Sequence, residues 1–270
     1  MKTNLMSSIE LLNYYRQMST EVFTVVDLET TGGMGHKDRI IEISVLKATL
    51  KDGIQQILTD LINPEIAIPN QIVRFTGISQ NMVDHTSTSD RILPNYLPML
   101  ESGILTAHNF SFDYSFLQAE YRRLGITFKA QAQLCTVELS RLLLSHLPSR
   151  SLQKLVKHYG FDVGQSHRAE SDAIACWLLL EKLLTQILNS SDAEILHLFG
   201  QQWLSIKDIS VILKLSPNRV ESLFSDAAIK SRFSRYRQIN LYQRSGVEML
   251  ADKLKIESRK EIAEQLALPL

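Results

Sequence analysis

The stretch EVFTVVDLETTG, residues 21–32, decides the fold class of this chain. Its apolar run is typical of a buried strand that ends in a turn. Two more strands are expected over residues 38–50 and 55–62, joined by a turn at residues 51–53. The pattern therefore predicts a meander of three strands.

A different order follows the meander. A buried strand is expected at residues 104–107 and a helix from about 112 to 124. Further helices fit residues 137–144, 152–159 and 169–188. A mixed sheet flanked by helices accounts for residues 21–188, which predicts an α/β fold.

The C-terminal part has a different sequence pattern, with signals for short helices followed by a basic segment. Ser205 and Asp208 form a capping box for one short helix, and Ser216-Pro217 begins a second. Residues 228–247 then carry five Lys or Arg side chains and no acidic residue. The expected division is an N-terminal helix (1–20), an α/β domain (21–188), a linker (189–200), a small mainly helical domain (201–256) and a tail (257–270).

Composition excludes several classes of protein. The 270 residues are 44% hydrophobic and 21% charged, which suits a globular chain with a real core and excludes wholesale disorder. No apolar run approaches the roughly 18–20 residues that cross a bilayer, so we expect no membrane span and a cytoplasmic protein. The two cysteines make neither a disulfide framework nor a zinc site.

Asp27 and Glu29 lie two residues apart at the end of the first strand, so both side chains project from one face of the sheet. Two carboxylates on an apolar strand repel each other and lose hydration unless a cation lies between them. Oxygen ligands suit Mg²⁺ or Mn²⁺, and a pair of such ions is typical of phosphodiester cleavage.

Three further residues complete a candidate site. Asp113 enters a helix directly after a buried strand, and Asp172 lies early in the long apolar helix. His167 precedes that helix, where a loop histidine could accept a proton from an attacking water. Taken singly, an acid at a helix start also complements the helix dipole. The joint pattern favours a metal-dependent hydrolase.

The chain resembles the DEDD 3′–5′ exonucleases of RNase H-like fold, in the subgroup with a histidine five residues before the last aspartate. Its motifs read VVDLETTG (25–32), HNFSFDYSFL (108–117) and HRAESDA (167–173), with DRIIEI (38–43) and FTGIS (75–79) between them. The resemblance implies that Asp27, Glu29, Asp113 and Asp172 bind two metal ions. It also implies that His167 is the general base.

The same resemblance implies a set of substrate contacts. Leu28, Thr30, Thr31, Phe75, Asn109 and Phe112 would hold the terminal nucleotide. Asn109 could also be a turn former, and His108 could either support a residue of the site or have a purely structural role. Glu42 is expected to make a structural hydrogen bond, and Glu170 to be a first-turn helix acid.

Residues 203–250 resemble the winged helix-turn-helix of the MerR and excisionase type, although the glycine that usually turns the wing is missing. In that arrangement Asn218, Arg219 and Ser222 would face the DNA groove, and Arg232, Arg235 and Arg237 would meet phosphates. The alternative is a small packing module.

The final residues QLALPL (265–270) resemble the peptide by which bacterial polymerases and repair proteins bind the sliding clamp. Gln265, Leu266, Leu268 and Leu270 would make that contact.

The sequence thus predicts an exonuclease that releases mononucleotides from DNA 3′ ends, similar to the proofreading subunits of bacterial polymerases, with nucleic acid, a clamp and a polymerase as partners. An RNA-trimming enzyme shares the active site and is the first alternative. A nucleic-acid-binding regulator with a silent nuclease domain, and a scaffold between clamp and partner, are the others.

Overall fold

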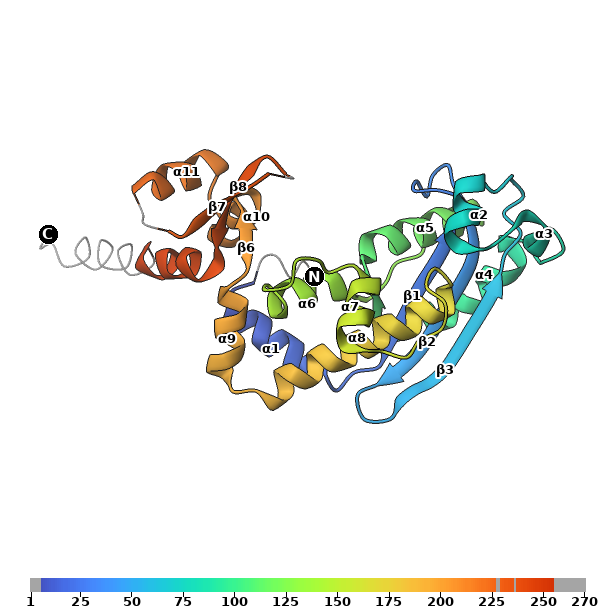
Figure 1. The fold of residues 1–270 in the computed structure, drawn as a ribbon, viewed down its shortest axis with the longest axis horizontal. Coiled ribbons are helices and arrows are strands. Elements are labelled where there is room, and N and C mark those ends of the chain that lie inside the picture. Colours follow the sequence, from blue (N-terminus) through green and yellow to red (C-terminus); the bar gives the residue numbers. More distant parts are fainter. Residues whose placement is uncertain (1–5, 227–228, 236, 255–270) are drawn as a thin grey trace, which may run out of the picture. The chain divides into compact units, whose positions relative to one another are not determined.

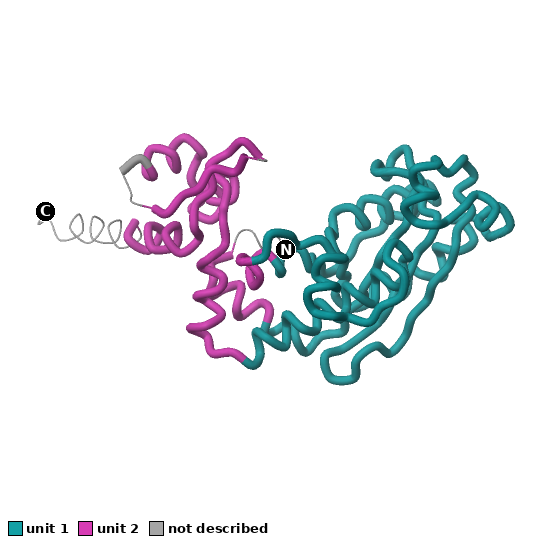
Figure 2. Tube along the Cα trace, in the orientation of Figure 1, with its two compact units in different colours: residues 1, 16–140, 147–189 teal, residues 2–15, 141–146, 190–270 magenta. Residues whose placement is uncertain are grey.

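The computed structural model describes residues 6–226, 229–235 and 237–254. The described chain divides into two compact units (Figure 2). The first unit holds residues 16–140 and 147–189, and the second holds the described residues of 2–15, 141–146 and 190–270.

The first unit is built on a five-stranded sheet (Figure 1). Its strands are β1 (Phe23–Thr30), β2 (Ile40–Thr49), β3 (Gly53–Leu61), β4 (Ile104–Ala107) and β5 (Ala132–Cys135), in the spatial order β3-β2-β1-β4-β5. The pairs β1–β2 and β2–β3 are antiparallel, whereas β4 runs parallel to β1 and β5 parallel to β4. The expected meander and mixed sheet are confirmed, and β1 lies at the centre of the sheet.

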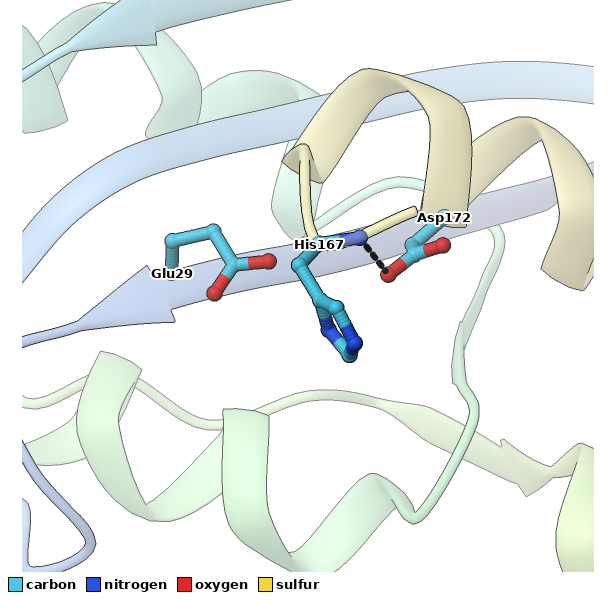
Figure 3. Close-up of side chains that lie close together, drawn as sticks. All are labelled: Glu29, His167 and Asp172. Atoms are coloured by element: carbon cyan, nitrogen blue, oxygen red, sulfur yellow. Dashed lines mark hydrogen bonds between the residues drawn. The ribbon is translucent and has the colours of Figure 1, made fainter. Parts of the chain in front are cut away.

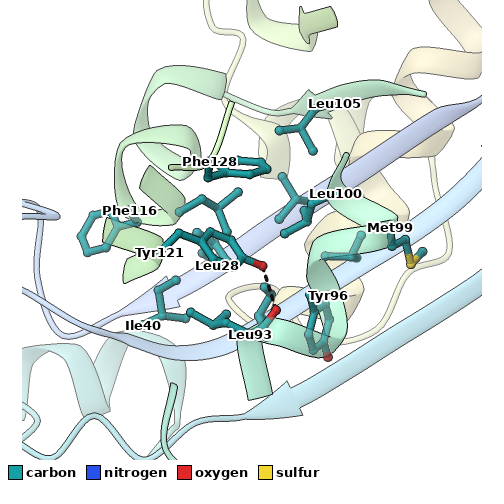
Figure 4. Packing of buried hydrophobic residues seen from close by; sticks show 14 of the residues in the cluster. Leu28, Ile40, Leu93, Tyr96, Met99, Leu100, Leu105, Phe116, Tyr121 and Phe128 are labelled. Carbon is teal, nitrogen blue, oxygen red and sulfur yellow. Dashed lines mark hydrogen bonds between the residues drawn. The ribbon is translucent and has the colours of Figure 1, made fainter. Parts of the chain in front are cut away.

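The two faces of β1 carry different chemistry. Val26 and Leu28 belong to a buried apolar cluster that also includes Leu93, Tyr96 and Tyr121 from helices on that side (Figure 4). Because successive side chains of a strand alternate between faces, Asp27 and Glu29 point to the opposite face. Helix α8 packs against β1 and β2.

Helices surround this sheet. They are α2 (Asn70–Thr76), α3 (Gln80–Val83), α4 (Ser89–Leu100), α5 (Phe110–Arg123), α6 (Thr136–Leu143), α7 (Leu152–Tyr159) and α8 (Ala169–Asn189). Helix α7 has the expected bounds because Gly160 closes it in a left-handed conformation with φ 67°. In α8, the buried Trp177 packs against Phe23 of β1, with ring centroids 6.0 Å apart.

The second unit combines short helices with a small sheet. Its elements are α9 (Asp192–Gly200), β6 (Trp203–Ser205), α10 (Ile206–Leu213), α11 (Pro217–Asp226), β7 (Ser231–Ser234) and β8 (Ile239–Gln243), and residues 244–254 are helical. The sheet order is β6-β8-β7, with both pairs antiparallel. The expected capping box of Ser205 and Asp208 is present at the start of α10.

Two features of this unit differ from the expected division. Residues 189–200 were expected as a linker, but most of them form α9, because Ser191 and Glu194 make a capping box inside the polar run. The start of α1 (Ser8–Met18) belongs to this unit as well. The buried Arg244 donates a hydrogen bond of 3.0 Å to the carbonyl of Met6. This bond joins the residues just before α1 to the helical residues 244–254.

None of the helices in the described ranges has the length and apolarity that a bilayer crossing requires.

Candidate active site

The sheet brings the predicted acidic residues together at one end of β1. Glu29 and Asp27 lie on the α8 face of β1, and Asp113 enters the first turn of α5 directly after β4. Since β4 is the parallel neighbour of β1, the carboxyl ends of the two strands meet at the same edge. Asp172, in the first turn of α8, completes the set.

Glu29, Asp113 and Asp172 are all buried, and Asp27 is half-buried. Burial raises the pKa of Asp27 well above its usual range, and the neighbouring carboxylates, Asp113 first, raise it further. Burial and nearby negative charge raise the pKa of Glu29 to about 8. The pKa of Asp113 and that of Asp172 are raised mainly by burial. The cluster therefore repels itself, and a bound cation would relieve the repulsion.

His167 completes the cluster from the loop before α8. One ligand atom from each of Glu29, His167 and Asp172 can be chosen so that the three lie within 4.8 Å of one another (Figure 3). The backbone N–H of His167 donates to Oδ2 of Asp172 at 3.1 Å. This bond accompanies a left-handed backbone at His167, with φ 61°.

Two side chains hold the imidazole ring of His167. The amide nitrogen of Gln153 lies 2.8 Å from its Nε2. The ring of Phe75 packs on the imidazole with centroids 3.7 Å apart, although 59% of Phe75 is exposed. Gln153 was not anticipated, because nothing in the sequence links the start of α7 to the loop at residue 167.

These residues line a cavity of about 530 Å³. Of the residues expected at the site, the lining includes Asp27, Leu28, Glu29, Thr30, Phe75, Asn109, Phe112, Asp113, His167 and Asp172. Thr31 is not part of the lining. Its N–H and its Oγ1 are both bonded to the backbone of Arg39, so Thr31 fixes the turn after β1 instead.

Several lining residues were not expected. They are Gly32, Ile72, Thr76, His108, Val137, Arg150, Ser151, Leu152 and Gln153. His108, for which two roles were left open, has Nδ1 2.9 Å from Oγ1 of Thr136 and Nε2 2.9 Å from the carbonyl of Arg150. His108 therefore ties the end of β4 to the segment that precedes α7.

The candidate DNA contacts of the second unit lie on its surface. Asn218, Arg219 and Ser222 are exposed residues of α11. Arg235 and Arg237 are exposed in the turn between β7 and β8, where Gln238 takes the left-handed conformation with φ 53° that a glycine would otherwise supply. The guanidinium of Arg232 lies 4.3 Å from the ring centroid of Trp203. Gln265, Leu266, Leu268 and Leu270 fall outside the described residues.

Comparison with known proteins identifies the family of the first unit. The sequence profile of the family described as "Exonuclease" matches residues 24–180. The chain is 32% identical over 200 residues to a PolC-type DNA polymerase III of Clostridium perfringens and 31% identical over 172 residues to the 3′-5′ exonuclease DinG of Bacillus subtilis. These matches cover 74% and 63% of this chain but only 14% and 18% of the relatives.

A solved structure shares the fold. It is the zinc-bound complex of Escherichia coli exonuclease I with single-stranded DNA, with a TM-score of 0.58 and 16% identity. The match covers 63% of this chain and 42% of the other.

Proposed function

Since the chain belongs to the exonuclease family, we propose that it is a metal-dependent 3′–5′ exonuclease that releases nucleoside monophosphates from DNA ends. The observation that carries this proposal is the convergence of four carboxylates and one histidine on a single cavity. We further propose that it acts in DNA replication or repair in the cytoplasm, in association with a polymerase, a context suggested by the PolC-type relative.

The donor set supports Mg²⁺ or Mn²⁺ as the cofactor, two ions to a site. Asp27, Glu29, Asp113 and Asp172 offer oxygen ligands only. Burial and mutual repulsion raise their pKa values, and a bound cation would oppose this shift by favouring the ionised carboxylates. Bound ions would supply charge neutralisation at the reacting phosphate.

The protein residues have separable tasks in this proposal. His167 accepts the proton of the attacking water at a ring nitrogen, and Gln153 and Phe75 orient its ring. Phe75 and Phe112 contact the terminal nucleotide, whose bases offer flat faces to aromatic rings. Leu28, Thr30 and Asn109 line the same space and contact the sugar and phosphate.

The proposal is tested by digesting a 5′-labelled single-stranded DNA and an RNA of the same sequence side by side. We expect a ladder that shortens from the 3′ end of the DNA, with nucleoside 5′-monophosphates as product. A copy with a phosphorothioate at the 3′-terminal linkage is the control and should slow the first step. Faster digestion of the RNA would instead identify the RNA-trimming alternative, and internal cuts would contradict exonuclease action.

For the second unit, we propose a winged helix-turn-helix that binds duplex DNA. Helices α10 and α11 followed by the β7–β8 hairpin support this assignment, with Asn218, Arg219 and Ser222 toward the groove and Arg232, Arg235 and Arg237 toward phosphates.

For the C-terminus, we propose that residues 265–270 bind the sliding clamp, on the strength of the sequence pattern alone. Deleting these six residues should abolish clamp binding in a pull-down and clamp-dependent stimulation on long templates, and leave digestion of short oligonucleotides unchanged. Normal clamp binding by the truncated protein would refute the assignment.

A further inference from the structure

A buried carboxylate that no substrate contact explains lies beside the site. Glu42 of β2 is 1% exposed and pairs directly across the sheet with Glu29 of β1. Like charges in directly opposite positions destabilise a sheet, and a buried carboxylate needs partners. An apolar side chain would satisfy packing at this position, so Glu42 requires another explanation.

Both oxygens of Glu42 are directed to the first turn of α8. Arg168 approaches them through Nε, at 3.0 and 3.2 Å, and through Nη2, at 2.5 Å from Oε1. Oε2 also accepts the backbone N–H of Ala169 at 2.8 Å. Glu42 therefore binds the chain at the two residues between His167 and the rest of α8.

A second contact ties the same turn to the sheet. Oγ1 of Thr59 in β3 donates to Glu170 at 2.7 Å. Within the turn, the N–H of Asp172 donates to the carbonyl of Arg168 at 3.0 Å, and the N–H of His167 donates to the carboxylate of Asp172. The Glu42–Arg168 pair thus contacts the turn that carries both His167 and Asp172.

We propose that Glu42 and Arg168 form a positioning pair that sets His167 and Asp172 opposite Glu29. Neither side chain lines the cavity. This inference rests on the proposed function for its kinetic consequence, but its structural consequence, the spacing of the metal-binding carboxylates, can be measured separately.

A competing explanation is that Glu42 and Arg168 act on the site only through the electrostatic effect of their charges on Glu29. The two explanations predict opposite changes in cation binding for Arg168→Gln. The negative charge of Glu42 and the positive charge of Arg168 shift the pKa of Glu29 in opposite directions. If only the field mattered, Glu42→Gln would weaken cation binding and Arg168→Gln would strengthen it. If the pair positions the turn, both substitutions weaken Mn²⁺ binding and both lower kcat.

The experiment uses the full chain with Glu42→Gln, Arg168→Gln, Arg168→Lys and the double variant Glu42→Gln/Arg168→Gln. Mn²⁺ binding is measured by electron paramagnetic resonance, and kcat and KM are measured on a short DNA oligonucleotide. We expect each single Gln variant to lower kcat about 10- to 100-fold with KM little changed, because small displacements of reacting groups have effects of this order. Arg168→Lys keeps the charge but loses the planar fork, so it should also lower kcat.

The double variant restores the local net charge and leaves two amides that can bond to each other. We therefore expect partial recovery of kcat relative to Glu42→Gln, which leaves a cation without its partner. The matched control is Glu120→Gln. Glu120 is fully buried and bonded to Arg39 at 2.8 Å and Arg123 at 3.0 Å, but it lies outside the cavity lining.

Glu120→Gln should lower the unfolding temperature and leave kcat of the folded protein unchanged. Tighter Mn²⁺ binding by Arg168→Gln, or wild-type kcat in both single variants, would overturn the positioning role. If the wild-type chain digests no nucleic acid, the proposed function fails, and the Mn²⁺ binding of the four variants still decides this inference.

Discussion

The two units of the molecule differ in where their charged side chains lie: those of the candidate active site in the first unit are largely buried, and the arginines proposed to contact DNA in the second unit are exposed. The first concentrates carboxylates on a buried patch, where neighbouring carboxylates raise the pKa of Asp27 and that of Glu29. The second spreads arginines over an exposed helix and hairpin. A buried cluster of like charge costs folding energy and so indicates a ligand, whereas exposed cations cost little and are compatible with many roles. The comparison explains why the chemistry of the first unit can be argued further than that of the second.

The largest effect should come from removing one member of the buried cluster. Asp27→Asn and Asp172→Asn should reduce nuclease activity to background, because the oxygen ligands of a cation are lost. The unfolding temperature without metal should not fall, since each substitution removes a buried negative charge that is repelled by its neighbours. Activity of the wild-type chain should vanish in excess chelator and return with Mg²⁺ or Mn²⁺. Full digestion in chelator would contradict the interpretation that the buried carboxylates of the first unit bind a cation.

Replacing His167 tests whether the cluster takes part in proton transfer or only binds cations. His167→Ala should lower kcat on the order of 10²–10⁴-fold with little effect on KM, as for a lost general base. His36, which is exposed and outside the cavity lining, is the matched control, and His36→Ala should retain wild-type kcat. A kcat for His167→Ala equal to that of the control would assign the imidazole no part in proton transfer.

The pH dependence of stability should differ between the units. The pKa of Glu29 in the folded state is about 8, which is above its value in the unfolded state. At pH values between these two pKa values, Glu29 therefore holds a proton in the folded state that it has lost in the unfolded state. In chelator, the free energy of unfolding should therefore fall as pH rises from about 5 to 8, by at most about 1.4 kcal/mol per pH unit for this group.

Thermal unfolding across this pH range, with and without Mg²⁺, measures the effect. Glu29→Gln should reduce the pH dependence, to which the raised pKa values of Asp27, Asp113 and Asp172 also contribute, and Mg²⁺ should reduce it as well. A stability that rises with pH in chelator would contradict the raised pKa of Glu29.

The smallest effect is expected at the exposed cations of the second unit. If Arg232, Arg235 and Arg237 contact three phosphates, the logarithm of duplex affinity should fall with the logarithm of salt with a slope contribution of roughly −2.7. Replacing all three by Gln should remove that contribution, as measured by fluorescence anisotropy across a salt series. The control replaces three exposed lysines of the first unit by Gln: Lys51, Lys129 and Lys182. An unchanged slope in the arginine variant would favour the packing-module interpretation.

The sequence was sufficient where the signal was local or strongly patterned. The bounds of α7 follow from its apolar spacing and from Gly160, and the alternation around Asp27 set the face of β1. Strand β5 was missed because its four residues are too short to show a period and are held by pairing with β4. The capping signal at Ser191 was available in the sequence, but the polar residues around it were interpreted as a linker.

Contacts between distant segments could not be predicted in the same way. Gln153 reaches His167 only because α7 and the loop before α8 are neighbours in space. Thr31 matched a motif, but it is not part of the cavity lining, and its hydrogen bonds to Arg39 hold the turn after β1. Glu42 was expected to make a structural hydrogen bond, and it does so with a partner 126 residues away.

The positions of the tryptophans give the molecule a built-in optical readout. The chain has two tryptophans, Trp177 buried in the first unit and Trp203 half-buried in the second. Buried indoles emit at shorter wavelength than hydrated ones, so in single-tryptophan variants the emission of Trp177 reports unfolding of the nuclease unit alone. The guanidinium of Arg232 over Trp203 makes the second fluorophore a sensor of a different event. A phosphate that draws Arg232 away from the ring would change the intensity of Trp203, so titration with unlabelled DNA would show whether and where the second unit is engaged.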